Sequence, residues 1–151
     1  MQIVPYTPDF REDCLAIFHS NLPKFFAADE LELFDKFLDE VIPADYYVVL
    51  IDGRPVACGG IFFDKRNNEA GLAWGMVSVL YHRKGIGKLL TAFRIALLKK
   101  RYPDKMLKIE TSQHTAGFYE KNGFSIVDIL PDGFGKGIDK YTMEMAPKTG
   151  N

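Results

Sequence analysis

The sequence is poor in cysteine, since only Cys14 and Cys58 occur among its 151 residues. Two cysteines cannot form a disulfide framework, and neither stands at the spacing of a metal-binding motif. Each lies inside an apolar stretch of the chain. We therefore expect two reduced core cysteines in an intracellular protein, and no metal site.

Neither sign of charge predominates, because 19 lysines and arginines face 20 aspartates and glutamates, a formal net charge of −1. A balanced surface generates no long-range field that would attract nucleic acid or an anionic membrane. No apolar run approaches the ~20 residues that a membrane span requires, and residues 1–10 lack the basic and apolar segments of a signal peptide. We therefore expect a cytoplasmic protein whose partners include no nucleic acid and no membrane.

The chain has enough apolar residues, 47%, for one hydrophobic core. We expect a single domain over residues 1–146 and a tail over 147–151. Periodicity and turn signals predict helices over 10–20, 29–40, 85–101 and 115–122, and strands over 3–6, 46–51, 55–63, 70–79, 106–111, 124–130 and 140–145. Hairpins come first and a strand–helix–strand crossing follows, which predicts an α/β fold with a mixed sheet and helices on both faces.

A glycine turn at the start of the 85–101 helix is the first chemical signal. Residues 77–88 read Val-Ser-Val-Leu-Tyr-His-Arg-Lys-Gly-Ile-Gly-Lys. A helix N-terminus offers unpaired backbone N–H groups, and Gly85 and Gly87 allow an anion to approach them. Arg83, Lys84 and Lys88 add positive charge. The pattern indicates a phosphate cradle, although two glycines before a helix also serve as an ordinary turn.

The known nucleotide motifs do not fit this turn. A P-loop is excluded because Leu89 follows Lys88, and a dinucleotide fingerprint fails because Leu90 stands at the third glycine position. A protein that binds ATP through the turn therefore remains only a distant alternative.

A second motif, Phe-Tyr-Glu-Lys-Asn-Gly-Phe at 118–124, follows about thirty residues later. At this separation and with this element order, the pair of motifs resembles the GNAT superfamily of N-acetyltransferases. The family's Arg/Gln-x-x-Gly-x-Gly/Ala motif falls on residues 82–87. His82 stands where Arg or Gln is usual, and Ser112 where many members carry Asn.

The resemblance implies a GNAT-like fold: a mostly antiparallel sheet in which two central parallel strands, here ending at Val79 and Thr111, splay apart. It further implies acetyl-coenzyme A as co-substrate, with no metal. The pantetheine arm would pair with backbone groups of Val77 and Val79, and a backbone N–H near Val77 would polarise the thioester. The cofactor-binding residues carried over are Val77, Ser78, Val79, His82, Arg83, Lys84, Gly85, Ile86, Gly87, Lys88, Ser112 and Tyr119.

The same resemblance assigns acid and base roles. Tyr119 matches the family's general acid, and a phenol is protonated at neutral pH and can donate to the leaving thiolate. Its alternative is a core tyrosine beside Phe118 and Phe124. Family members often have a Glu that acts as the general base where this chain has Gly71. Glu69 or Glu110 is therefore the candidate base. Each of them is also compatible with an ordinary acid at the surface or sheet edge.

The acceptor pocket would include Phe25, Phe26, Glu30, Trp74 and the 133–137 loop. The acidic 29–40 helix could attract a cationic amine, or serve only as a solvated face. We predict transfer of an acetyl group to an amine in a ternary complex, with a small molecule favoured over a peptide, by a monomer or homodimer. The alternative is a non-catalytic acyl-CoA-binding or sensor domain, suggested by the missing carboxylate at Gly71.

Overall fold

The computed structural model describes residues 1–147. Its helices are α1 (Arg11–Ser20), α2 (Glu30–Glu40), α3 (Ile86–Arg101) and α4 (Ala116–Lys121), with short 3-10 turns at Pro8–Phe10, Pro43–Asp45 and Val79–Tyr81. Its strands are β1 (Gln2–Pro5), β2 (Tyr46–Ile51), β3 (Arg54–Asp64), β4 (Glu69–Val77), β5 (Leu107–Thr111), β6 (Ser125–Gly135) and β7 (Ile138–Met145). Of the predicted tail, all but Pro147 lies outside the described residues.

The strands form one mixed sheet in the order β1-β2-β3-β4-β5-β7-β6. Only β4 and β5 are parallel neighbours; the other pairs are antiparallel. The predicted hairpin at Asp52-Gly53 is confirmed, and both residues take the positive φ that a tight hairpin turn requires. The predicted α/β class with a mostly antiparallel sheet is therefore confirmed.

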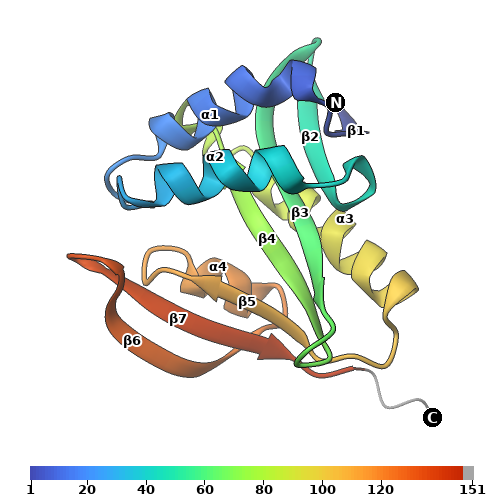
Figure 1. Cartoon of the computed structure of the whole chain (residues 1–151), viewed down its shortest axis with the longest axis vertical. Coiled ribbons are helices and arrows are strands. Elements are labelled where there is room, and N and C mark those ends of the chain that lie inside the picture. Colours follow the sequence, from blue (N-terminus) through green and yellow to red (C-terminus); the bar gives the residue numbers. More distant parts are fainter. Residues whose placement is uncertain (148–151) are drawn as a thin grey trace.

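The parallel pair is short and then opens. Ala70 pairs with Leu107 and Gly71 with Lys108, and no further pairing joins the two strands in the part of the chain that the structure describes. Beyond Gly71, β4 and β5 diverge, as Figure 1 shows. The backbone groups of β4 that face β5 are therefore left without strand partners over the rest of β4.

Helices cover both faces of the sheet, as predicted. On one face α1 and α2 bury Phe18 and Phe34 against Tyr46 and Cys58 (Figure 1). On the other face α3 and α4 close two further core clusters, one around Ile86 and Leu90 of α3, the other around Leu98 of α3 and Tyr119 of α4. Cys14 and Cys58 are both buried and unpaired.

Two predicted boundaries are wrong. Strand β4 ends at Val77 rather than Val79, because residues 79–81 turn into a 3-10 helix. The 132–137 segment is not a separate loop: β6 continues to Gly135 and the hairpin closes at Gly137. Asp132 supports this extension, since it takes a positive φ and its carboxylate accepts the Gly137 N–H at 2.7 Å. The sequence pattern of this glycine-rich segment does not indicate the strand pairing and the hydrogen bond that extend the hairpin.

Gly71 is where β4 approaches β5 most closely. A Cβ built on Gly71 would lie 2.0 Å from the Lys108 carbonyl oxygen and 2.6 Å from the Phe62 ring. The position therefore has no room for any side chain, and the carboxylate that the family resemblance places there cannot be accommodated.

Gly71→Ala is expected to lower the free energy of unfolding by about 3 kcal/mol, because the clash involves backbone that cannot move without breaking the parallel pair. Urea denaturation followed by circular dichroism measures the change. Gly117→Ala in α4 is the matched control, since open space surrounds that glycine, and it should leave stability equal or slightly higher. If both variants lost the same amount of unfolding free energy, the effect of Gly71→Ala could not be attributed to the close approach of β4 and β5.

No helix among residues 1–147 is both long and apolar enough to cross a membrane.

Candidate functional site

The opening between β4 and β5 leads into a cavity of about 1120 Å³. Its wall contains most of the residues selected from the sequence: Phe25, Phe26, Glu30, Trp74, Val77, Val79, His82, Arg83, Gly85, Gly87, Lys88, Glu110, Ser112 and Tyr119. Four others lie outside the wall: Glu69, Ser78, Lys84 and Ile86. Residues that are far apart in the chain are therefore brought together around one site.

The glycine turn stands at one end of this cavity. Gly85 precedes α3 with φ +81°, a conformation that suits glycine, so the helix begins at Ile86. The N–H groups of the first helical turn lack intrahelical partners, and the helix dipole adds partial positive charge there. The Ile86 side chain is buried, so that residue can offer only its backbone. With Arg83 and Lys88 in the wall, this end of the cavity suits a phosphate or pyrophosphate group.

Three side chains form hydrogen bonds with the backbone at the end of β4. The sequence analysis did not select Asn21 or Ser20, and it assigned His82 to cofactor binding. Asn21, at the end of α1, donates through Nδ2 to the Val77 carbonyl at 2.9 Å. The His82 ring nitrogen Nε2 lies 2.8 Å from the same oxygen and must be the donor, because a carbonyl only accepts. The Val79 N–H donates to the Ser20 hydroxyl at 3.1 Å, so it is already engaged.

The Val77 N–H remains available to the cavity. Ser78 donates its N–H to the Val56 carbonyl at 2.8 Å, and successive N–H groups of an antiparallel strand point to opposite sides. The Val77 N–H therefore points away from β3 and into the opening beside β5. A carbonyl oxygen placed there could accept a hydrogen bond from the strand edge.

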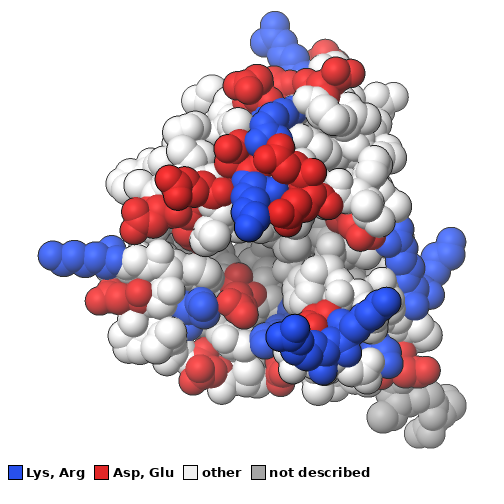
Figure 2. Space-filling view, viewed as in Figure 1, with Lys and Arg blue, Asp and Glu red and all other residues white. Residues whose placement is uncertain are grey.

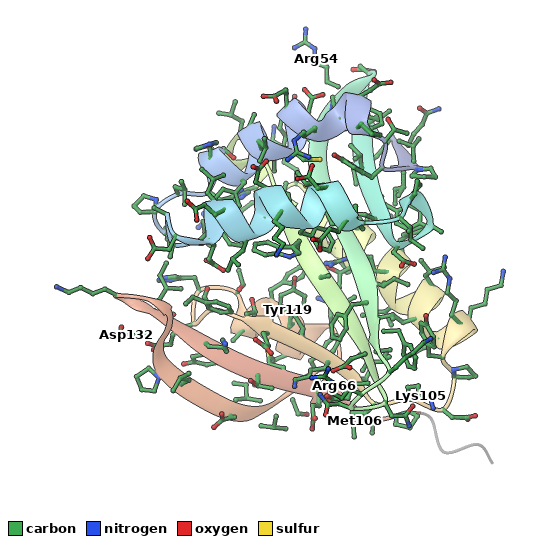
Figure 3. The ribbon with its side chains drawn as sticks, viewed as in Figure 1. Arg54, Arg66, Lys105, Met106, Tyr119 and Asp132 are labelled. Atoms are coloured by element: carbon green, nitrogen blue, oxygen red, sulfur yellow. The ribbon has the colours of Figure 1, made fainter. Side chains whose placement is uncertain are left out.

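Tyr119, the candidate general acid, contributes a phenolic hydroxyl to the site. It lies on α4, is 7% exposed and forms part of the cavity wall. Its ring packs edge-on against Phe118 and Phe124, with centroids 5.1 and 6.1 Å away. In Figure 3 Tyr119 lies between α2 and the strands β5 and β7, where the site opens. The residue is thus both packed in the core and part of the site, so the two readings of the sequence do not exclude each other.

Aromatic rings form the opposite wall. Phe26 stacks on Phe18 at 4.8 Å and faces Trp74 at 6.3 Å. Trp74 takes φ +47° at a β-bulge in β4 and packs on Phe34 at 5.1 Å. Phe134, from the β6–β7 hairpin, closes the same side. The wall presents apolar ring faces, which favour a cation or an apolar chain.

One buried carboxylate shares the cavity wall with these rings. Glu30, at the start of α2, is 8% exposed, and its Oε2 accepts the Ala27 N–H at 2.8 Å. Burial raises the pKa of Glu30 above its ordinary value of 4.5, although the Ala27 hydrogen bond and the charge of Lys140 oppose the shift. A carboxylate with a raised pKa is a stronger base than an exposed one.

The two acids predicted as bases occupy different places. Glu69 lies at the closed end of the strand pair, outside the cavity wall, and its carboxylate is 3.8 Å from the Lys108 ammonium. Glu110 lies in the wall and is 3.5 Å from the Lys140 ammonium. Glu110 and Glu30 are therefore the acids that face the site.

Charge is unevenly distributed around the opening. Figure 2 shows a hollow between α2 and the β6–β7 hairpin, with acidic side chains gathered over α1 and α2. Those of α2 are Glu30, Glu32, Asp35, Asp39 and Glu40. Arg11 pairs with Asp35 and Asp39, which neutralises part of the group. Acidic side chains thus lie near the aromatic side of the cavity, where Lys24 and Lys140 also stand over the rings of Phe25 and Phe134, and basic side chains line the end at α3.

Comparison with known families gives one match. The family model described as an acetyltransferase (GNAT) domain matches residues 43–126, more than half of the chain. The matched segment contains both motifs and the strands β4 and β5. No curated protein matches the sequence.

Solved structures share the whole architecture. The ribosomal-protein-S18-alanine N-acetyltransferase of Escherichia coli is 18% identical, with a TM-score of 0.78 over 99% of this chain and 96% of its own. Ard1 from Thermoplasma volcanium is 21% identical, with a TM-score of 0.78 over 97% of both chains. An aminoglycoside 6'-N-acetyltransferase complexed with coenzyme A is 15% identical, with a TM-score of 0.74 over 97% of both chains. At these identities the likeness establishes a common fold.

Proposed function

Because the chain belongs to the GNAT acetyltransferase family, we propose that it transfers the acetyl group of acetyl-coenzyme A to an amine within a ternary complex. The observation that carries the proposal is the single cavity that joins the splayed edge of β4, the N-terminus of α3 and Tyr119. A small-molecule acceptor is favoured over a peptide.

The residues present fit coenzyme A. Its pyrophosphate requires hydrogen-bond donors and positive charge, which the first turn of α3 and Arg83 and Lys88 supply. Its pantetheine arm carries amides that can add to a free strand edge, and β4 has such an edge beyond Gly71. Val79 is left out of this pairing because its N–H already donates to Ser20. The coenzyme's thioester supplies the activated acetyl group.

The chain's own groups account for the remaining chemistry. The Val77 N–H is oriented to stabilise negative charge that develops on the carbonyl oxygen under attack. The Tyr119 hydroxyl donates a proton to the departing thiolate sulfur. Glu30 or Glu110 accepts the proton that the acceptor's ammonium group must lose before its nitrogen attacks. The second proton, which the nitrogen loses as the amide forms, replaces the one that Tyr119 gave to the sulfur. Attack is direct, and no acetylated side chain is formed.

The acceptor is expected to be a cationic amine. Glu30 shares the cavity wall with Phe26 and Trp74, and a carboxylate and aromatic ring faces each attract an ammonium group. Further acidic side chains of α2 lie beside the hollow in Figure 2. The names of the similar proteins include a protein alanine and an aminoglycoside as acceptors, and both are amines.

A second candidate function is a sensor that binds an acyl-CoA without transferring its acyl group. The observation that favours it is the lack of room for any carboxylate at Gly71. A sensor would bind acetyl-coenzyme A yet acetylate no amine, and the Tyr119 hydroxyl would be dispensable.

The first test is calorimetric titration with acetyl-coenzyme A, with ATP as the control ligand. We expect micromolar binding of acetyl-coenzyme A and binding of ATP weaker by at least about tenfold, because ATP lacks the arm that pairs with β4. A screen of amine acceptors follows. Equal affinity for both ligands would mean that only the glycine turn binds, and the acetyltransferase proposal would fail.

A further inference from the structure

A fully buried arginine lies beside the cavity and has no role in the chemistry above. Arg94, on α3, is 1% exposed and is the largest of the fully buried side chains. It forms part of the cavity wall, together with Thr91 one turn earlier on the same helix. A guanidinium group remains charged at any physiological pH, so its burial places a permanent positive charge inside the domain.

This charge is poorly compensated. Among residues 1–147, none of the ion pairs includes Arg94. Its Nη1 donates to the Gly60 carbonyl and its Nη2 to the Thr91 hydroxyl, both at 3.4 Å, and its Nε has no partner. Five N–H groups thus share two long hydrogen bonds, whereas buried charges in proteins are normally paired.

The sheet is shaped to receive the guanidinium group. A Cβ on Gly75 would lie 2.5 Å from Nη2, and a Cβ on Gly59 would lie 3.2 Å from the central guanidinium carbon. Both positions are glycine, so the charged group rests directly on the backbone of β3 and β4. The contact is at the β-bulge of β4, next to Trp74 with its positive φ.

The charge therefore lies close to the expected reaction centre. Gly75 precedes Val77 by two residues, about 7 Å along a strand. Val77 carries the N–H assigned above to the thioester carbonyl, so this inference rests on the proposed function. An anionic group a few bonds away from the reacting carbonyl, or from the attacking nitrogen, would therefore be near the Arg94 guanidinium group.

We propose that Arg94 is a carboxylate-binding residue of the cavity: one of the two reactants carries a carboxylate, which pairs with the guanidinium group when the reactant is bound. The carboxylate belongs either to the acyl group, as in a dicarboxylic acyl-CoA, or to the acceptor, as in an amino acid. In both cases the acyl–sulfur bond breaks and the acyl–nitrogen bond forms as before, and Arg94 takes no part in the bond changes.

Two matched pairs of ligands test this on the wild-type protein by calorimetry, with acetyl-coenzyme A as the control for the cofactor site. Succinyl-CoA and butyryl-CoA have acyl chains of equal length and differ in the terminal carboxylate. Lysine and cadaverine, titrated in the presence of coenzyme A, differ only in the α-carboxylate. We expect the carboxylate-bearing member of one pair to bind at least about tenfold more tightly, and the pair that responds identifies the source.

The variant Arg94→Met retains the unbranched apolar stem of the side chain and removes the charged guanidinium group. It should abolish the preference within that pair by weakening the carboxylate ligand about 10- to 100-fold, with less than about threefold change for its uncharged partner and for acetyl-coenzyme A. Its melting temperature should not fall, since an uncompensated buried charge stabilises little. Arg94→Lys retains the charge but lacks the planar set of N–H donors of a guanidinium group, so it should show an intermediate preference. This variant provides the test if Arg94→Met does not fold.

Equal binding within both pairs of wild-type titrations would overturn the proposal even if acetyl-coenzyme A binds normally. An Arg94→Met variant that weakens both members of a pair equally would assign Arg94 a packing role instead. Absence of acetyl-coenzyme A binding would contradict the proposed function, and both matched pairs, with lysine and cadaverine then titrated without coenzyme A, would still decide whether Arg94 binds a carboxylate.

Discussion

Replacing Tyr119 by Phe is expected to lower kcat about 100-fold or more while acetyl-coenzyme A affinity changes little. The ring packs between Phe118 and Phe124 and would remain in place, but the variant lacks the proton that the leaving thiolate requires. Steady-state kinetics and calorimetric titration of the same preparation measure the two quantities separately.

Tyr102→Phe is the matched control. Tyr102 stacks on Phe63 at 4.8 Å and lies outside the cavity wall, so removal of its hydroxyl should leave kcat within about twofold. If Tyr119→Phe retains full turnover, another group protonates the sulfur. A wild-type protein that binds acetyl-coenzyme A and acetylates no amine would instead favour the sensor function.

Replacing Glu30 by Gln should produce the second large effect, a fall in kcat/KM for a cationic amine of about 10- to 100-fold. Gln retains the size of the side chain and can still accept the Ala27 N–H, but it neither attracts an ammonium group nor takes its proton. Because this variant leaves the α3 end of the cavity unchanged, acetyl-coenzyme A affinity should stay within about twofold.

The pH profile identifies the group directly. Burial raises the pKa of Glu30 above 4.5, and the carboxylate acts only when ionised. The wild-type kcat/KM should therefore rise with pH through this raised pKa, and the limb should be lost in Glu30→Gln. The free energy of unfolding should depend on pH in the opposite direction. Because the pKa of Glu30 is raised in the folded state, folding favours the protonated carboxyl. The contribution of Glu30 to stability is therefore present at low pH and declines as pH rises through that pKa. Glu30→Gln should therefore not lower stability at pH 7.

Glu32→Gln on the same helix is the control, because Glu32 is exposed and outside the cavity wall. A comparable loss in this variant would attribute the effect to the general negative charge of α2, which added salt would screen. Full activity in Glu30→Gln together with a loss in Glu110→Gln would transfer the base to Glu110.

The features of the fold that the sequence analysis predicted correctly depend on short stretches of chain. A positive φ at Gly85 and a helix that starts at Ile86 are requirements of a local backbone conformation, and a residue pattern records them. The same holds for the hairpin at Asp52-Gly53 and for α4, which carries Tyr119. Of these residues, Gly85 and Tyr119 lie in the cavity wall.

The features that the analysis missed depend on contacts between distant segments. Asn21 bonds to Val77, 56 residues away, and this contact is absent from any local pattern. The predicted strand end at Val79 was wrong for the same reason, since Ser20 binds its N–H and the chain turns there. Arg94 lies on the buried stripe of α3, four residues after Leu90 and four before Leu98. Its residue type would instead suggest the surface, and the glycines at 59 and 75 leave the room for its burial.

The sequence by itself therefore determined the elements, their order and the glycine turn at the start of α3, because hydrophobic periodicity and glycine conformations are properties of neighbouring residues. Only the tertiary structure decided which carboxylates line the cavity, how far β4 and β5 separate, and that a guanidinium group lies against the bulge. Each of these depends on close approach of backbones that are remote in the chain, such as Gly71 against the Lys108 carbonyl, and close approach is set by packing rather than by local preference.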